Sequence, residues 1–409
     1  MQNSIKKPKN IRQNNGKLML DLYLNNRVLT VPQIAEQLGL SRTTIFKIND
    51  QLINLKLIRS VGKGDSTKIG GKKPERYSLN KHYGYGLTFY IAYDFLEVTL
   101  FNLHLKIELQ KRVPFERNSN LEVISELIKK EYDTIVEQKS KANILGITIA
   151  VHALVNTKTD ICVHAIYFPS WGINIPLAQI ISEKLETDIP IYVDSWIWLK
   201  TQIAFKYYPI VADVDSFVLI YSGRNGFVTG IYNRDNISES NSHLIGEIGH
   251  MIVNPNDKQM CQCGGYGCVE SLTDIKRIIQ NGNAERENYP NSQIFKNGEV
   301  TFDAIIKAFK EDDPLAVKLL DETASWVAIA ISNLNLILFP DIVLFEGEIC
   351  LAGKKWYKMV EEKLEKVSLV RFKNKINLKF VEPNFEAIAE GSAYYIFNQF
   401  IKNIYPNLK

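Results

Sequence analysis

Apolar residues at helical spacing predict two short helices near the start of the chain. Leu18 and Leu22 lie four positions apart, which predicts a first helix that ends at about Leu24. A second helix is predicted within residues 30–39, because this segment carries signals for both ends of a helix: the capping pair Thr30 and Gln33, the first-turn residue Pro32 and the terminating residue Gly39. Its buried face is expected to consist of Ile34, Ala35 and Leu38.

A third helix is predicted after a short turn, and the pair has the pattern of a helix-turn-helix motif. Ser41 can cap this helix, whose inward positions are Ile45, Ile48 and Leu52. Hydrogen-bond donors occupy the outward positions near its N-terminus, which is the end that a recognition helix presents to the major groove. We therefore predict DNA contacts from Arg42, Thr43, Thr44 and Lys47. Any two amphipathic helices could mimic this pattern.

Two short strands are predicted next, at residues 57–61 and 75–79, and the loop between them is rich in glycine and lysine. Such a hairpin tip can follow a phosphate backbone or enter a minor groove. We interpret the hairpin as a wing and predict further DNA contacts from Lys72 and Lys73. The alternative is a flexible loop whose lysines only increase solubility.

The remainder of the chain alternates between strand and helix patterns, which indicates an α/β domain with two lobes and a cleft between them. The predicted strands are residues 97–103, 144–151, 189–193, 217–221, 228–232 and 342–345. The predicted helices are residues 121–139, 176–185 and 315–338. Polar stretches such as Asn281-Gly282-Asn283 predict that residues 271–300 form an insertion or a loop.

Charge is unevenly distributed along the 409 residues. Residues 1–80 contain 15 Lys and Arg and 5 Asp and Glu, a net of +10; the remaining residues contain 34 (49 − 15) basic and 40 (45 − 5) acidic ones, a net of −6. A small basic segment before a larger acidic one favours a polyanion-binding module joined to a second kind of domain. A solvated basic tail would have the same charge, so the helix-turn-helix pattern is what decides between them.

The length of the chain predicts two or three domains, because it exceeds what one ordinary core supports. Its apolar runs are far shorter than a membrane span, and the basic, polar N-terminus lacks the apolar core of a signal peptide. We therefore expect a cytoplasmic protein without a membrane partner.

Three of the five cysteines lie within eight residues of one another, whereas Cys162 and Cys350 stand apart. An odd, clustered set in a chain without a signal peptide favours a metal site over disulfides. Three thiolates and one imidazole would make a closed, structural zinc site from His250, Cys261, Cys263 and Cys268. The alternative is a group of free thiols with an unrelated histidine.

Two linked motifs resemble the signature of the ROK family of repressors, open reading frames and kinases: GEIGH at residues 246–250 and C-x-C-G-x-x-G-C-x-E at residues 261–270. Residues 30–80 are similar to the winged helix of its NagC/XylR-type regulators, and residues 171–177 resemble its W-x-x-x-P-L turn with one extra residue. The resemblance implies a winged helix-turn-helix domain at residues 1–82. It implies that residues 83–409 form a two-lobed, actin-like, hexokinase-type (ribonuclease H-like) α/β domain that binds sugar between its lobes.

Carried over residue by residue, the resemblance assigns the zinc ligands to the same His250 and three cysteines. It assigns the sugar-contacting acids to Asp194, Glu247 and Glu270, with His250 beside the sugar. Carboxylates suit this role because each can accept hydrogen bonds from two neighbouring hydroxyls. Two departures affect this pocket, since Val193 replaces an expected Asn and Val151-His152-Ala153 replaces V-P-G.

The segments that hold phosphate in ROK kinases are altered in this chain. The kinase motif D-x-G-G-T corresponds to residues 90–94, which read YIAYD, so that side chains replace the acid and both glycines. The motif G-T-G-x-G-x-G corresponds to residues 224–230, which read RNGFVTG, and a late glycine cluster reads Glu346-Gly347-Glu348. Phosphoryl transfer needs a phosphate cradle and an acid that organises the metal, so these losses predict a domain that is not an enzyme.

We therefore interpret the chain as a sugar-responsive DNA-binding transcriptional regulator, and more specifically as a repressor. A homodimer or homotetramer would place two winged helices on a palindromic operator, and a monosaccharide or sugar-phosphate effector would change the angle between the lobes. One alternative is an active ROK sugar kinase with a regulatory DNA-binding arm, in which Asp194 would be the catalytic base. The other is a constitutive DNA-binding protein with a vestigial pocket.

Overall fold

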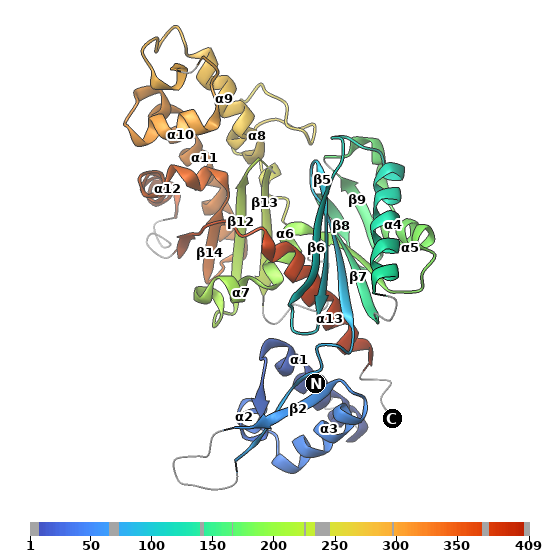
Figure 1. Ribbon diagram of the computed structural model, residues 1–409. Coiled ribbons are helices and arrows are strands. Elements are labelled where there is room, and N and C mark those ends of the chain that lie inside the picture. Colours follow the sequence, from blue (N-terminus) through green and yellow to red (C-terminus); the bar gives the residue numbers. More distant parts are fainter. Residues whose placement is uncertain are drawn as a thin grey trace, which may run out of the picture. The chain divides into compact units, whose positions relative to one another are not determined.

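The computed structural model describes residues 8–64, 73–139, 143–165, 167–224, 226–233, 246–296, 298–369 and 376–404 (Figure 1). The chain divides into two compact units. Unit 1 contains residues 1–153, 159–194 and 388–409, and unit 2 contains residues 154–158 and 195–387. Each unit is therefore assembled from segments that are far apart in the sequence.

Unit 1 begins with a small module of three helices and a three-stranded antiparallel sheet; the sequence predicts the helices and the hairpin but not the strand β1. The helices are α1 (Pro8–Asn25), α2 (Val31–Leu38) and α3 (Arg42–Asn54). The strands β1 (Leu29–Thr30), β2 (Ile58–Lys63) and β3 (Glu75–Leu79) lie in the order β1-β3-β2. The predicted wing is the hairpin of β2 and β3, and its tip at residues 65–72 lies outside the described residues.

The predicted capping signals are found at the start of α2 and in the turn between α2 and α3. The Thr30 N–H donates to Gln33 Oε1 at 2.8 Å and the Gln33 N–H donates to Thr30 Oγ1 at 3.4 Å, which completes a capping box. Gly39 ends α2 with a left-handed φ of 63°. Ser41 then caps α3 by accepting a hydrogen bond from the Thr44 N–H at 3.2 Å.

The larger part of unit 1 is a five-stranded sheet with the order β11-β7-β4-β5-β6. Its strands are β4 (Tyr85–Ile91), β5 (Phe95–Asn102), β6 (Ile107–Pro114), β7 (Ile144–Val151) and β11 (Ile191–Ser195). The helices that accompany it are α4 (Leu121–Gln138), α5 (Leu177–Leu185) and α13 (Glu386–Ile404). Between β7 and α5 in the sequence, three strands form a small sheet of order β10-β9-β8. They are β8 (Ala153–Asn156), β9 (Ile161–Ala165) and β10 (Ile173–Ile175).

Unit 2 contains a four-stranded sheet with the order β13-β12-β14-β15. Its strands are β12 (Ser216–Gly223), β13 (Gly226–Asn233), β14 (Ile342–Glu346) and β15 (Leu378–Phe380). The helices are α6 (Trp196–Gln202), α7 (Ala204–Tyr207), α8 (Val269–Thr273), α9 (Ile275–Ala284), α10 (Phe302–Lys310), α11 (Pro314–Leu338) and α12 (Lys354–Val367). The long helix α11 lies in the main apolar core of this unit and accepts a hydrogen bond at Leu320 O from Trp356 Nε1 of α12 at 3.1 Å.

The predicted strands and helices of the large domain are present within a few residues, but the alternative that residues 271–300 form a loop is wrong. Most of this segment is helical, and Asn281-Gly282-Asn283 lies inside α9. Gly282 is buried, and a Cβ at this position would lie 3.3 Å from side-chain carbons of Ile294 and Leu319. The polar residues therefore cover a helix whose apolar face belongs to the core of unit 2.

The buried face of α1 also differs from the prediction. Leu18 is 41% exposed, whereas the buried positions are Met19, Leu20, Tyr23 and Leu24. These side chains belong to an apolar cluster that includes α13 and the five-stranded sheet in addition to α2 and α3. Local spacing could not indicate which side of α1 faces this second set of contacts.

Membrane insertion of a helix finds no support in the part of the chain that the structure describes. No helix there combines the length and the apolar character that are needed to cross a bilayer.

Replacement of Thr30 by Ala should lower the free energy of unfolding by about 1 kcal/mol, because the capping box loses its side-chain acceptor. Chemical denaturation of both proteins would measure this difference. The matched control is Thr134→Ala on α4, whose hydroxyl only donates to Lys130 O within the helix. An equal loss in both variants would contradict a specific capping role for Thr30.

Candidate metal centre and ligand-binding residues

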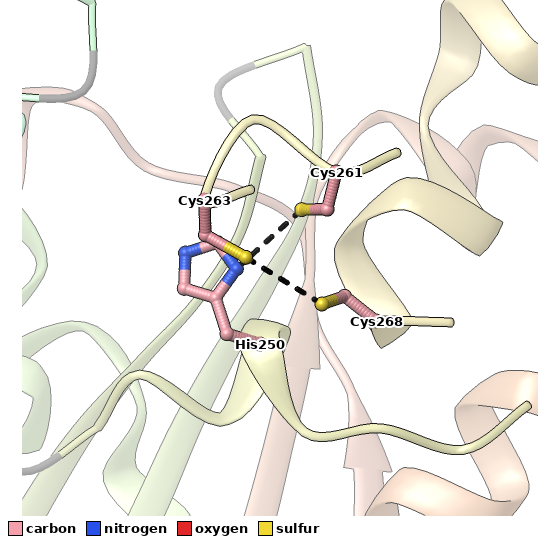
Figure 2. Close-up of side chains that lie close together, drawn as sticks. All are labelled: His250, Cys261, Cys263 and Cys268. Atoms are coloured by element: carbon pink, nitrogen blue, oxygen red, sulfur yellow. Dashed lines mark hydrogen bonds between the residues drawn. The ribbon is translucent and has the colours of Figure 1, made fainter. Parts of the chain in front are cut away.

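Four side chains with metal-binding atoms converge in unit 2, and they are the four that the sequence predicts. His250 ends the short 3-10 helix η5 (Ile248–His250), Cys261 and Cys263 lie on the loop that follows, and Cys268 precedes α8. Figure 2 shows these side chains pointing toward one another. One ligand atom from each lies within 4.8 Å of all the others.

The spacing of these atoms fits a tetrahedral zinc ion. Zn–S bonds of about 2.3 Å imply an S–S edge of about 3.8 Å, and a Zn–N bond of about 2.1 Å implies an S–N edge of about 3.6 Å. Cys263 Sγ lies 3.7 Å from Cys268 Sγ, and Cys261 Sγ lies 3.6 Å from His250 Nδ1. Three sulfurs and one imidazole nitrogen are also the donor types of a closed structural zinc site.

Two of the thiols of this cluster, those of Cys261 and Cys268, need a cation to ionise at neutral pH. Burial, followed by the neighbouring thiols, raises the pKa of Cys268 to about 12, and burial also raises the pKa of Cys261. These thiols therefore keep their protons unless a positive charge compensates the thiolates. A divalent metal ion is a group of that kind.

Backbone geometry permits the unusual spacing of one residue between Cys261 and Cys263. The Gly264 N–H donates to Cys261 O at 2.9 Å and the Cys261 N–H donates to Gly265 O at 2.8 Å, which closes a tight turn. Gly267 has a φ of 74°, and a Cβ there would lie 1.9 Å from Asn254 O. The glycine that precedes Cys268 is therefore required by both conformation and space.

Two of the predicted sugar-contacting acids lie beside this metal cluster. The second ring nitrogen of His250, Nε2, lies 3.5 Å from Glu247 Oε2. Glu270 accepts a hydrogen bond from the Phe227 N–H of β13 at 3.2 Å. Burial raises the pKa of Glu270, while the hydrogen bond from the Phe227 N–H opposes that rise. The structure thus brings Glu247, His250 and Glu270 together.

Gly249 holds the GEIGH segment close to β13. A Cβ at Gly249 would lie 2.1 Å from Phe227 O, so only glycine allows this approach. Because Phe227 also donates its N–H to Glu270, both motifs of the sequence are anchored to the same residue of one strand. This shared anchor fixes the spacing of the acids.

The third predicted acid, Asp194, belongs to unit 1, whereas the other three predicted sugar-contacting residues belong to unit 2. Asp194 is buried near the end of β11. Burial raises the pKa of the nearby Asp160, the Val193 N–H lowers it, and the charge of Asp194 raises it again. No site role for Asp160 follows from the sequence, because an aspartate in a polar turn is too common to be a signal.

Residues 90–94, which are predicted to correspond to the first kinase phosphate motif, carry aromatic side chains that pack within unit 1. Tyr90 is buried, and its hydroxyl forms a hydrogen bond with His152 Nε2 at 2.8 Å. Burial lowers the pKa of His152 to about 3, so the imidazole is neutral at physiological pH. Tyr93 packs edge-to-face on Tyr167 with ring centroids 5.3 Å apart, and the Arg117 guanidinium carbon lies 4.5 Å from the centroid of the Tyr93 ring.

Side chains of unit 2 also lie at the other two segments that are predicted to correspond to phosphate motifs. A Cβ at Gly223 would lie 1.9 Å from Glu348 Oε2, which accepts a hydrogen bond from the Tyr221 hydroxyl at 2.5 Å. Glu346 is fully buried in an ion pair with Lys200, and it accepts a hydrogen bond from the Tyr208 hydroxyl at 2.8 Å. No role for Lys200 follows from the sequence, because this residue lies 146 positions before its partner.

The residues predicted to contact DNA lie at the N-terminus of α3 and on the wing. Arg42, Thr43 and Lys47 are exposed, whereas Thr44 is half-buried and its hydroxyl is 2.8 Å from the Ser41 hydroxyl. Lys73 is exposed two residues before the second wing strand β3, and Lys72 lies outside the described residues.

Comparison with known proteins places these features in one family. The model of the ROK family matches residues 92–391. The xylose repressor of Caldicellulosiruptor bescii is 24% identical over 376 residues, which cover 88% of this chain and 89% of that protein. The glucokinase of Halalkalibacterium halodurans is 28% identical over 239 residues, which cover 57% of this chain and 70% of the glucokinase.

A solved structure confirms the predicted fold class over nearly the whole chain. The ROK family transcriptional regulator described as a homolog of the E. coli MLC protein superposes with a TM-score of 0.78 at 22% identity. The match covers 97% of this chain and 98% of the regulator. The two chains therefore share a small N-terminal module joined to a two-lobed α/β domain.

Purified protein should contain about one equivalent of zinc per chain, and Cys261→Ser should lower both the metal content and the melting temperature. A metal that binds only the folded chain stabilises it, and a loss of about 2–3 kcal/mol corresponds to a decrease of about 5–10 °C. Elemental analysis and thermal unfolding measure the two effects.

The matched control is Cys162→Ala, because Cys162 is a buried cysteine outside the cluster. Its metal content should equal that of the unaltered protein. Full metal content and an unchanged melting temperature in Cys261→Ser would contradict a structural zinc site.

Proposed function

The chain belongs to the ROK family, and from that premise we propose that it is a sugar-responsive transcriptional repressor without kinase activity. The observation that carries the proposal is a combination in one chain. A basic helix-turn-helix module is joined to a domain in which Glu247, His250 and Glu270 lie together, while side chains occupy the segments predicted to correspond to phosphate motifs. The similarity to a xylose repressor over 88% of the chain supports the same function.

The N-terminal module, which we assign to residues 1–82, binds operator DNA through α3 and the wing. Arg42, Thr43 and Lys47 present exposed donors at the N-terminus of α3, where a recognition helix meets base edges and phosphates. Thr44 contributes less directly, because its hydroxyl already contacts Ser41. Lys72 and Lys73 would follow the backbone from the wing.

Residues 83–409 bind the sugar and form the homodimer or homotetramer. A helix-turn-helix protein reads a palindromic operator with two modules, so at least two copies of the chain are needed. As a transcription factor, the protein would act in the cytoplasm.

The sugar is held by hydrogen bonds from its hydroxyls to Asp194, Glu247 and Glu270. The Phe227 N–H positions Glu270, and the imidazole of His250 positions Glu247. Zinc bound by His250 and the three cysteines would hold that imidazole in place through Nδ1 and supply no chemistry to the sugar. The effector is a monosaccharide or a sugar phosphate.

Phosphoryl transfer is not supported, because a nucleotide needs backbone N–H groups and positive charge where its phosphates bind. Here the Glu348 carboxylate lies against Gly223, and Tyr90 replaces the acid of the first motif. Both changes oppose the binding of a triphosphate, the first by charge and the second by volume.

The second candidate function is a sugar kinase with a DNA-binding arm. It is favoured by the retention of Asp194, which would be the base that takes the proton of the attacking hydroxyl. The similarity to a glucokinase over 57% of the chain also favours it.

Arg42→Ala and Lys47→Ala should each weaken operator binding about tenfold, because each removes a positive contact to DNA. The operator would be selected from a random-sequence DNA pool, and fluorescence anisotropy over a range of salt concentrations would measure affinity. Lys358→Ala is the matched control, since Lys358 is an exposed lysine on α12 of unit 2. Absence of any sequence-selective binding by the unaltered protein would refute the proposed function.

At least one of D-xylose, D-glucose and N-acetyl-D-glucosamine should raise the melting temperature, and ATP with Mg²⁺ should add nothing. Asp194→Asn and Glu270→Gln should each weaken sugar binding about tenfold or more, because a hydrogen bond to a charged acceptor contributes roughly 1.5–3 kcal/mol. Thermal shift and calorimetry measure both effects. Asp303→Asn on α10 is the matched control.

A coupled assay for ADP separates the two candidate functions. The repressor releases no ADP with any of the three sugars. Sugar-dependent ADP release that disappears in Asp194→Asn would instead establish the kinase.

A further inference from the structure

The C-terminal helix α13 shares a core with the DNA-binding module. Five of its residues belong to the same buried apolar cluster as the core residues of α1, α2 and α3: Ala389, Ala393, Ile396, Phe397 and Ile401. The cluster also contains Phe101, on strand β5 of the five-stranded sheet, and Leu103, which follows that strand. The DNA-binding module is therefore packed onto the rest of unit 1 rather than joined to it by a free linker.

Polar and aromatic contacts reinforce this packing near the end of α13. The Tyr394 hydroxyl donates to Asn25 Oδ1, on the last residue of α1, at 3.2 Å. The ring centroid of Phe400 lies 5.7 Å from that of Tyr83, a residue of the segment that joins the module to strand β4. Burial raises the pKa of Asp21 on α1, and the charge of Lys402 on α13 is close enough to oppose that rise.

The residue next to Tyr394 faces the strand that carries the predicted sugar acid. The Tyr395 ring packs edge-to-face on Tyr192, with centroids 5.5 Å apart and planes at 87°. Tyr192 lies two positions before Asp194 on β11. Burial, followed by the charges of Asp194 and Asp160, raises the pKa of Tyr395, so this phenol lies within the field of the acid.

The packing between α13 and the sheet leaves no room for independent movement. A Cβ at Gly146 would lie 2.9 Å from Ile396 Cγ2 and 3.2 Å from Tyr192 Cε2. The Thr148 hydroxyl donates to Ser392 O at 3.2 Å, which ties β7 to the backbone of the helix. In a core packed to this density, a shift of β11 must be passed on to α13.

We propose that α13 couples sugar binding at Asp194 to the DNA-binding module, with Tyr395 and Tyr394 as positioning residues on the sugar side and on the DNA side. This inference rests on the proposed function and names the route of its regulation. Sugar hydroxyls that engage Asp194 displace the end of β11, and Tyr192 passes the displacement to Tyr395. Helix α13 then moves α1 through Tyr394 and the shared core, which changes the placement of the paired recognition helices on the operator.

The coupling is reciprocal, because operator and sugar favour different positions of the same helix. Operator binding must therefore weaken sugar binding by the same factor by which sugar weakens operator binding. That factor is the quantity that a change in α13 should alter, while the two separate affinities remain near those of the unaltered protein.

The test is Tyr394→Phe in the full-length protein, which removes the hydroxyl that reaches Asn25 and keeps the ring. Calorimetry with D-xylose, D-glucose and N-acetyl-D-glucosamine, and anisotropy on the selected operator with and without each sugar, give both affinities and the coupling factor. We expect sugar affinity and sugar-free operator affinity within about twofold of the unaltered protein, and a coupling factor at least fivefold smaller. Asn25→Ala should have the same effect, and the double variant should add nothing to it.

Tyr357→Phe is the matched control, because its hydroxyl donates to Cys350 O at 2.9 Å in unit 2. It also loses one tyrosine hydrogen bond, and its coupling factor should be unchanged. Hydrogen exchange of residues 15–25 provides a readout without DNA. Sugar should alter exchange in α1 of the unaltered protein and of Tyr357→Phe, but not of Tyr394→Phe.

The outcomes distinguish this inference from the proposed function. Equal coupling factors in Tyr394→Phe, Asn25→Ala and the unaltered protein overturn the inference and leave the repressor function intact. Absence of any effect of the three sugars on operator binding by the unaltered protein overturns both.

Discussion

The apolar cluster that α13 shares with the DNA-binding module is the contact on which the organisation of unit 1 depends. A module of this size held only by a flexible linker would sample many orientations, and the state of a distant ligand would have no effect on it. Here Ile396 and Phe397 lie against Gly86 and Gly146 of the sheet, and Ile401 continues the same core toward α1–α3. Close packing of this kind responds to small displacements by switching between arrangements, as regulation of DNA binding requires.

Side chains occupy the segments of the large domain that are predicted to correspond to the kinase phosphate motifs. The buried Tyr90–His152 pair is neutral at physiological pH and occupies volume, while the Glu348 carboxylate lies against Gly223 with a charge that repels phosphate. The buried Lys200–Glu346 pair adds a cation in the same region, but Glu346 already compensates its charge. Under the proposed function, neutral sugar hydroxyls need no phosphate contacts, so an acid such as Glu270 can bind them without a nucleotide site.

The metal cluster explains why two short motifs stand close together in the sequence. His250 uses one ring nitrogen toward the thiols and has the other 3.5 Å from Glu247, and Glu270 follows Cys268 by two residues. A single ion on these four ligands would therefore fix the orientation of both acids without touching the sugar. Gly249 and Gly267 allow the close backbone contacts that keep the two motifs on β13 and on the metal loop.

Local signals in the sequence determined the helix-turn-helix module and the metal cluster. Thr30, Gln33 and Gly39 act within a few residues of one another, and Cys261, Cys263 and Cys268 lie on one loop, so spacing alone predicts their contacts. Only the tertiary structure decided which face of α1 is buried, because α13 lies more than 360 positions away in the chain. The helical character of residues 271–300 likewise depends on burial against α11, and the Lys200–Glu346 pair on two segments 146 positions apart. Contacts between residues so far apart in the sequence leave no local pattern, because the neighbours of each residue in the chain do not indicate its distant partner.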